Sequence, residues 1–564
     1  MRWPGSACVA VGLGLAMLAG CSLPLPRGVH VSHDVRAEQR DPGDIEVLPP
    51  GPRQRANPVD IVQGFLGAES SPENGHAIAR QYLTADAHWA DNEVQVYDPA
   101  SLRVAESSSD PSSATVAVTF TKLGLLGKDG AYSDLVPSPV KEGYTLVRGR
   151  AGDWRISSPP FGLRLTPADR DRSFRPRRLF YLSPSPKATL HVVPDLVLLP
   201  VATGQVQAAI SRLLQPPSSA LQGSVTTAFP VGTRLLSLRA EPGGLYDVNL
   251  SAELEHASGP QRQGLSAQLV WTLRGLDPRF ESLRVLAAGK PFAVPSEGEV
   301  QKAEDWNVLD PEGLADGPLY FIGGGRLKTV TSAGRVGAGP AASAGLDVDR
   351  AAVTPDRTQI ALLHRDGGTV TVRAGPVSSD RYPVVLRAPG LSSPTWGSGE
   401  LGLWLLDGSG HVLLLRGTGR AVPVVVVGLS TRIRSIAVSR DGARVALVSD
   451  GLLYVGRITK AANGAPVVRP VLVAPELTGV TRVGWRDGTT LVALGVLMDT
   501  FVPVLLSVDG SSVRSLAVSG LPSKPGELAA SSLGTVVTAS GQLFVLSALG
   551  FQAGPPGAAP AYPG

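Results

Sequence analysis

The chain has 564 residues, of which 43% are hydrophobic and 18% are charged, and its formal net charge is +4. This length is too great for a single core and predicts several folded domains, and the composition excludes a largely disordered chain. Because the basic residues are not gathered in one long block, nothing indicates nucleic acid as a partner.

The N-terminus predicts a secreted, lipid-anchored protein. The apolar run 7–19 is too short to span a hydrocarbon core of about 30 Å, and it fits a signal peptide over residues 1–20. The run ends in Leu18-Ala19-Gly20-Cys21, which resembles a bacterial lipobox, and Cys8 is the one other cysteine. We therefore expect Cys21 to be the lipidation site, a diacylglycerol thioether that holds the protein at the extracytoplasmic face of the cell membrane. The alternative is an ordinary cleaved signal with a coincidental cysteine.

Residues 21–56 are rich in proline and charge and have no sustained apolar period. They predict a disordered tether between the lipid and the first domain. No later segment reaches about 18 uninterrupted apolar residues, so the lipid is the one membrane anchor that the sequence predicts.

Residues 57–167 predict an α+β domain. A helix starts at Asn57-Pro58, helical spacing continues over residues 77–83, and strand patterns follow at 115–123, 143–149 and 153–159. The turn Gly152-Asp153 joins the last two strands into a hairpin. Helices followed by an antiparallel sheet resemble the nuclear-transport-factor-2-like (NTF2-like) fold.

The stretch 168–178 contains five arginines beside two aspartates: Arg170, Arg172, Arg175, Arg177 and Arg178. We interpret it as a solvated Arg-rich connector between domains, and the alternative is a surface for an anionic partner.

A second α+β unit is predicted over residues 179–295. Strand patterns occupy 179–183, 188–200 and 244–251, and amphipathic helical patterns occupy 206–217 and 265–276. In the second helix, Gln268 is a polar residue placed to reach across an edge.

Short motifs in this unit carry a family resemblance. The pieces LFYL, LLQPP, TAFPVGTRLLSL, YDVNLS and SAQLVWTL occur in that order and resemble the germane (GerMN) domain, first named from spore germination proteins. With the lipobox, the preceding α+β domain and a β-rich region behind it, the whole chain is similar to the actinobacterial lipoprotein family LpqB. None of the shared motifs is a catalytic signature.

Residues 312–564 repeat a strand-turn-strand module and predict an all-β propeller. If Val353, Trp396, Val438, Trp485 and Ala530 are equivalent, the steps between them are 43, 42, 47 and 45 residues. That period matches one four-stranded blade of about 40 to 50 residues and predicts five or six blades. Strands at 319–330 are expected to close the ring with the C-terminal strands. The alternative is a β-sandwich or stacked sheets.

We find no constellation for chemistry, and predict no catalytic residue, cofactor-binding residue or metal ligand. The eight histidines are scattered without ligand spacing. The pattern Gly397-Ser398-Gly399-Glu400-Leu401-Gly402 lies in a predicted hairpin, whereas dinucleotide binding needs a strand-to-helix turn. Asp347, Asp349 and Asp441 are the remaining candidates, and aspartates in such turns usually accept backbone N–H groups.

Together these features predict a non-enzymatic, lipid-anchored interaction module. The LpqB resemblance implies a partner: the extracytoplasmic domain of the sensor histidine kinase MtrB, and through it an MtrAB-type two-component system that affects cell-wall metabolism and division. One alternative is a propeller that binds or hydrolyses an envelope glycan or peptide in its central funnel. Another is a purely architectural envelope protein.

Overall fold

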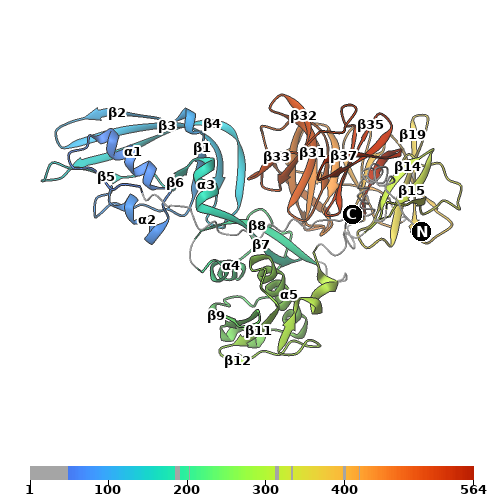
Figure 1. Ribbon diagram of the computed structural model, residues 1–564, viewed down its shortest axis with the longest axis horizontal. Helices are drawn as coiled ribbons and strands as arrows, with labels where there is room; N and C mark the ends of the chain where they lie inside the picture. Colours follow the sequence, from blue (N-terminus) through green and yellow to red (C-terminus); the bar gives the residue numbers. More distant parts are fainter. Residues whose placement is uncertain are drawn as a thin grey trace, which may run out of the picture.

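The structure is a computed structural model that describes residues 49–183, 191–201, 204–311, 317–331, 334–397, 402–417 and 420–564. The expected signal peptide, Cys8, Cys21 and most of the predicted tether lie outside the described residues. Figure 1 shows three units in chain order: a blue and cyan α+β unit, a green α+β unit, and a yellow to red β unit.

The N-terminal unit packs helices against one sheet of strand order β5-β4-β3-β1-β6, with β2 paired to β3. Its helices are α1 (Pro58–Ala68), α2 (Glu73–Arg80) and α3 (Pro167–Ser173). Its strands are β1 (Val94–Tyr97), β2 (Arg103–Ser109), β3 (Ser113–Leu126), β4 (Tyr132–Arg148), β5 (Trp154–Ser158) and β6 (Leu163–Leu165). The sheet is antiparallel except where β1 pairs with β6.

Helix α1 begins where the sequence predicts. The Asn57 side chain accepts a hydrogen bond from the Asp60 backbone N–H at 2.8 Å, which satisfies one of the free donors of the first turn. Ile61 and Phe65 are buried one turn apart and face the sheet core. The capping residue and the apolar spacing together explain this helix.

The hairpin agrees with its sequence prediction, whereas the second helix differs in position. The β4–β5 hairpin is confirmed, and Gly152 has a φ of +87°, which glycine adopts without a Cβ clash. Helix α2 lies earlier than the predicted 77–83, because Leu83 forms a β-bridge with Ile156 of β5.

The Arg-rich segment 168–178 is regular secondary structure, and four of its five arginines are exposed or half-buried. It runs from α3 directly into β7 (Phe174–Leu182). Arg170 is buried, and its Nη2 donates to the Ser511 carbonyl at 2.8 Å. The expectation was wrong for Arg170 because its acceptor lies 341 residues away in the sequence.

The middle unit combines a hairpin, a small sheet and two helices. Its other elements are β8 (Val192–Pro200), α4 (Gln205–Leu213), β9 (Leu235–Glu241), β10 (Leu245–Leu250), α5 (Gly259–Leu276), β11 (Ser282–Ala287), β12 (Lys290–Pro291) and β13 (Val300–Lys302). Strand β7 pairs with β8, and the sheet has the order β12-β11-β10-β9, with β13 paired to β11. Helix α5 is the crossover between the parallel strands β10 and β11.

Helix α5 is buried over ten consecutive residues, 264–273. Gln268 lies in this stretch, yet its amide is satisfied: Nε2 donates to the Phe180 carbonyl at 2.9 Å, and Oε1 accepts from the Ala228 N–H at 2.8 Å. The prediction that Gln268 makes polar contacts beyond its own helix is therefore confirmed, and its bond to Phe180 connects α5 to β7.

The C-terminal unit consists of six sheets in chain order within the described residues, five with four strands and one with five. The first contains β14 (Leu319–Gly323), β15 (Arg326–Val330), β16 (Val336–Ala338) and β38 (Ala558–Ala561). The second contains β17 (Arg350–Val353), β18 (Gln359–Asp366), β19 (Thr369–Pro376) and β20 (Val384–Pro389). The third contains β21 (Ser392–Trp396), β22 (Leu403–Leu406), β23 (Val412–Leu415) and β24 (Val422–Pro423).

The fourth sheet is the five-stranded one. It contains β25 (Val425–Val426), β26 (Ile433–Val438), β27 (Arg444–Ser449), β28 (Leu452–Lys460) and β29 (Pro466–Val473). The fifth contains β30 (Thr478–Trp485), β31 (Thr490–Leu497), β32 (Thr500–Ser507) and β33 (Val513–Ser515). The sixth contains β34 (Glu527–Ser531), β35 (Gly534–Ala539), β36 (Gln542–Ser547) and β37 (Gly550–Pro556).

The innermost strands form a closed ring. Strands β17, β21, β26, β30, β34 and β38 contact one another in that order, and β38 also contacts β17. Strand β38 pairs with β14, so strands at 319–330 close the ring with the end of the chain, as predicted. The architecture is a β-propeller and not a sandwich.

The repeat positions are equivalent in space. Val353, Trp396, Val438 and Trp485 each end an innermost strand. The Trp485 Nε1 donates to the Ala437 carbonyl of β26 at 2.8 Å, and Trp396 makes the same bond to the innermost strand before it at 2.9 Å. The tryptophans therefore join adjacent sheets.

Candidate functional site

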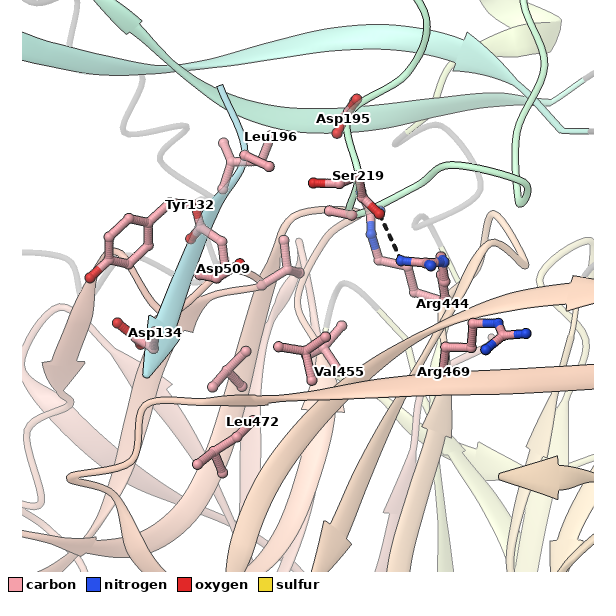
Figure 2. Close-up of a pocket in the computed structure, with 17 residues that line it drawn as sticks. Tyr132, Asp134, Asp195, Leu196, Ser219, Arg444, Val455, Arg469, Leu472 and Asp509 are labelled. Carbon is pink, nitrogen blue, oxygen red and sulfur yellow. Dashed lines mark hydrogen bonds between the residues drawn. The ribbon is translucent and has the colours of Figure 1, made fainter. Parts of the chain in front are cut away.

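A cavity of about 260 Å³ lies where the three units meet (Figure 2). The N-terminal unit contributes Tyr132 and Asp134 from the start of β4, and the middle unit contributes Leu196 of β8 and Ser219. The propeller contributes strands β27, β28 and β29 and the turn after β32. Because each unit supplies part of the wall, the cavity exists only in the assembled chain.

Arg444 of β27 joins the propeller to the middle unit. Its side chain is 3% exposed. Nη2 donates to the Pro194 carbonyl of β8 at 2.7 Å, and Nη1 donates to the Gly488 carbonyl at 3.1 Å. Gly488 has no side chain to hold Pro194 away, since a Cβ there would lie 2.5 Å from the Pro194 ring. The close approach of backbone to backbone is therefore built into the sequence.

The N-terminal and middle units are joined through the loop before β4. The Asp129 carboxylate accepts from the Ser219 N–H at 2.7 Å, and the Asp129 carbonyl accepts from Arg212 Nε at 2.8 Å. The Leu198 N–H of β8 donates to the Gly130 carbonyl at 2.8 Å. Backbone and side-chain bonds together fix the orientation of this pair of units.

The N-terminal unit also reaches the propeller. Besides the bond from Arg170, the Asp134 carboxylate accepts from the Ala474 N–H at 3.1 Å. Gly510, in the turn after β32, has a φ of +77°, and a Cβ at this position would overlap the Asp134 carboxylate. A glycine is therefore required there both by the turn and by the approach of Asp134.

The acidic side of the cavity holds two carboxylates, Asp134 and Asp509, with no ion pair among the described residues. Burial, together with the nearby carboxylates of Glu476 and Asp509, raises the pKa of Asp134 to about 6 against hydrogen bonds from Ala474 and Tyr132, which lower it. Asp509 Oδ1 accepts from Ser511 and Ser507, while its buried Oδ2 has no hydrogen-bond partner among the described residues.

The basic side of the cavity places two arginines side by side. Arg457 of β28 and Arg469 of β29 stand directly opposite each other in the antiparallel ladder. Arg457 Nη1 donates to the Ser219 carbonyl at 2.7 Å, and its buried Nε has no partner among the described residues. Burial and the Arg469 charge both lower the pKa of the Arg457 guanidinium.

The two ends of the innermost propeller strands carry different contacts. At the amino ends of the innermost strands, Arg350 binds Glu527 through two hydrogen bonds of 2.9 and 2.6 Å, and Arg482 adds a third at 3.2 Å. Burial opposes this charge, but the two arginines hold the pKa of Glu527 at about 2. At the carboxyl ends, Arg440 Nε donates to the Pro563 carbonyl at 3.0 Å, and residues 562–564 lie against these strands.

The aspartates singled out from the sequence make separate local contacts and do not line the cavity. Asp441 accepts from the Ala443 N–H at 2.9 Å, which is the expected turn role. Asp349 accepts from the Arg365 N–H at 2.6 Å, and Asp347 lies 3.7 Å from the Arg326 guanidinium. The structure brings none of these into a common site.

The other sequence candidates also form no site. Residues 398–401 of the glycine pattern, His30, His33 and Cys21 lie outside the described residues. Gly397 and Gly402 pair across the hairpin between β21 and β22, as predicted. Across the described ranges, no group of three or more His, Cys, Asp or Glu side chains could hold a metal ion. No helix in the same ranges is long and apolar enough to cross a membrane.

The sequence predicted none of the charged residues that line the cavity. Asp134, Arg457 and Arg469 lie in strands of the structure and belong to no motif of the sequence. One signal was present: Arg444 directly precedes the apolar run 445–448, and the structure buries all six residues of the strand 444–449. A buried arginine needs a partner, so its position pointed to a contact outside its own sheet.

Comparison with known proteins gives three family models in the order of the three units. Residues 51–171 match "Lipoprotein LpqB, N-terminal domain", residues 178–293 match the germane model described as "Sporulation and spore germination", and residues 325–563 match "Lipoprotein LpqB beta-propeller domain". A lipoprotein LpqB of Thermobifida fusca is 28% identical, with 91% of each chain covered. One from Streptomyces coelicolor is 27% identical, with 86% of this chain and 85% of the relative covered.

Solved structures are similar to parts of the chain. The first GerMN domain of GerM from Bacillus subtilis is 17% identical with a TM-score of 0.20, and covers 23% of this chain and 99% of its own. TolB from Acinetobacter baumannii is 13% identical with a TM-score of 0.34, and covers 55% of this chain and 86% of its own. The two LpqB models, the germane model between them and the nearly full-length relatives agree: this chain belongs to the LpqB family of lipoproteins.

Proposed function

We propose that this protein is a non-enzymatic accessory lipoprotein, anchored at the extracytoplasmic face of the cell membrane, which binds and modulates a sensor histidine kinase of an MtrAB-type two-component system. The observation that carries the proposal is the match to LpqB lipoproteins along almost the whole chain, behind a lipobox at Cys21. The pathway would affect cell-wall metabolism and division.

The anchor is the diacylglycerol thioether on Cys21. Labelling cells with radioactive palmitate should mark the wild-type protein, and Cys21→Ser should abolish the label and leave the protein uncleaved or released. Cys8→Ser is the matched control and should keep the label, because Cys8 lies inside the predicted signal peptide. Unchanged labelling of Cys21→Ser would contradict the anchor.

The three units support a binding role through their rigidity. Hydrogen bonds link each unit to both of the others, so a partner would meet one fixed surface with the propeller rim held at a set distance from the tether. Binding at such a rim requires shape and polar complementarity and no reactive group. A lipid anchor adds effective concentration beside a partner in the same membrane.

The kinase partner is tested by co-purification in mild detergent. The tagged protein should enrich the kinase together with its own lipidated form, and Cys21→Ser should lower the yield of the kinase. Reproducible absence of the kinase from the wild-type preparation would count against the proposal.

We further propose that the propeller has six blades, one for each sheet of the closed ring, and that the N-terminal unit has an NTF2-like fold. The helices followed by an antiparallel sheet support the second assignment. An experimental structure with another blade number, or with a different order of strands in the first sheet, would contradict these assignments.

The alternative of a glycan- or peptide-hydrolysing funnel receives no support from the described channel. Its carboxylate Glu527 is held ionised by two arginines and is not poised as an acid. Arg440 and residues 562–564 lie at the other end.

A further inference from the structure

The cavity between the three units has carboxylates on one side and arginines on the other, without an ion pair between the two sets. Figure 2 shows Asp134 and Asp509 on one side and Arg444 and Arg469 on the other, with Val455 between them and Leu472 below the aspartates. Among the described residues, no ion pair joins Arg457 or Arg469 to a carboxylate, and none joins Asp134 or Asp509 to a cation.

Each side on its own is electrostatically unfavourable. Arg457 and Arg469 are like charges directly opposite each other on neighbouring strands, an arrangement that destabilises a sheet unless an anion intervenes. Asp134 and Asp509 are partly buried carboxylates that repel each other. Arg457 Nε and Asp509 Oδ2 are buried atoms without a partner among the described residues, so a ligand that bonds to both sides of the cavity would satisfy them.

We propose that this cavity binds a small zwitterion, an amino acid or a dipeptide, with its carboxylate at Arg457 and Arg469 and its ammonium group at Asp134 and Asp509. The apolar floor of Val455 and Leu472 would lie under the body of the ligand. A cavity of about 260 Å³ is slightly smaller than ordinary ligand sites, which run upward from about 300 Å³, so it favours a very small ligand over a long peptide.

The site differs from the propeller funnel and does not depend on the kinase. Its walls come from all three units, so a bound ligand would be contacted by each of them and would stabilise their assembly. Arg469 and Val471 are exposed at the rim, which gives the ligand a way in.

Calorimetric titration of the full-length lipidated protein in detergent tests the proposal. The probe is the dipeptide Ala-Ala, and the matched probes are lactoyl-alanine, in which a hydroxyl replaces the ammonium, and alanyl-alaninamide, which lacks the carboxylate. We expect Ala-Ala to bind, and each matched probe to bind about tenfold more weakly, the size expected for losing one charge-assisted contact.

Two variants test which side of the cavity binds the carboxylate of the ligand and which binds its ammonium group. Arg469→Gln should abolish the preference for Ala-Ala over its amide, and Asp134→Asn should abolish the preference over lactoyl-alanine, as in a double-mutant cycle. Each preference is the ratio of two affinities measured on the same variant, so a loss of overall stability does not produce this pattern. Arg387→Gln, at an exposed arginine on β20, is the control and should keep both preferences.

Failure of Ala-Ala to bind, or equal binding of the three probes, would overturn the proposal. Phosphoethanolamine carries an ammonium and a phosphate, and tighter binding of this probe than of Ala-Ala would overturn the assignment to amino acids and peptides. None of these results depends on the kinase, so they leave its binding to be judged separately.

Discussion

Replacing Arg444 with leucine should loosen the contact between the propeller and the middle unit. The guanidinium is buried and donates to two carbonyls, Pro194 at 2.7 Å and Gly488 at 3.1 Å. It also lies 3.9 Å from the Asp441 carboxylate. A hydrogen bond to a charged group contributes about 1.5–3 kcal/mol, so we expect a loss of about 3–5 kcal/mol at this interface.

Native-state hydrogen exchange measures this loss where it occurs. Backbone amides in residues 192–200 and 486–490 should exchange at least about 100-fold faster in Arg444→Leu, because about 3 kcal/mol of protection is removed. Arg387→Leu removes an exposed arginine from β20 and should change exchange in neither segment. Unchanged protection of both segments in a folded Arg444→Leu protein would refute the role assigned to Arg444.

Three further predictions follow from single contacts. Burial raises the pKa of Asp134 from 3.8 to about 6, so the stabilising contribution of this residue is complete below pH 3.8 and is lost as the pH rises through 6. The urea midpoint of the wild type should therefore fall relative to that of Asp134→Asn between pH 4 and 7. Parallel pH curves for the two proteins would contradict this. Trp485→Phe removes the bond to the Ala437 carbonyl and should cost about 1 kcal/mol, measured by urea unfolding, whereas no loss would show that the bond contributes nothing. Arg164→Met removes the 2.8 Å ion pair to Glu142 from the N-terminal core and should cost about 3–5 kcal/mol; a thermal unfolding temperature equal to wild type would contradict it.

Local patterns predicted the parts of the fold that depend on neighbours in the sequence. Asn57 caps α1 because capping needs only the three residues that follow it. The propeller repeat was readable because Trp396 and Trp485 recur with the period of one sheet. The closing of the ring by residues 319–330 followed from the need to leave no open edge.

The contacts between the three units could not be predicted from local patterns. Arg444 and Pro194 are 250 residues apart, and Arg170 and Ser511 are 341 apart. Neither pair has a periodicity or a motif, since the contact depends on how folded units pack and not on how each one folds. Arg457 and Arg469 look like ordinary outward residues of two strands until the middle unit is placed beside them.

Crosslinking in intact cells, followed by identification of the partners, tests the central claim most directly. The account predicts that the extracytoplasmic domain of the sensor kinase is crosslinked to the wild-type protein and that the yield falls sharply in Cys21→Ser, because the anchor places both proteins in one membrane. A wild-type protein that is lipidated and folded yet yields no crosslink to the kinase would contradict it.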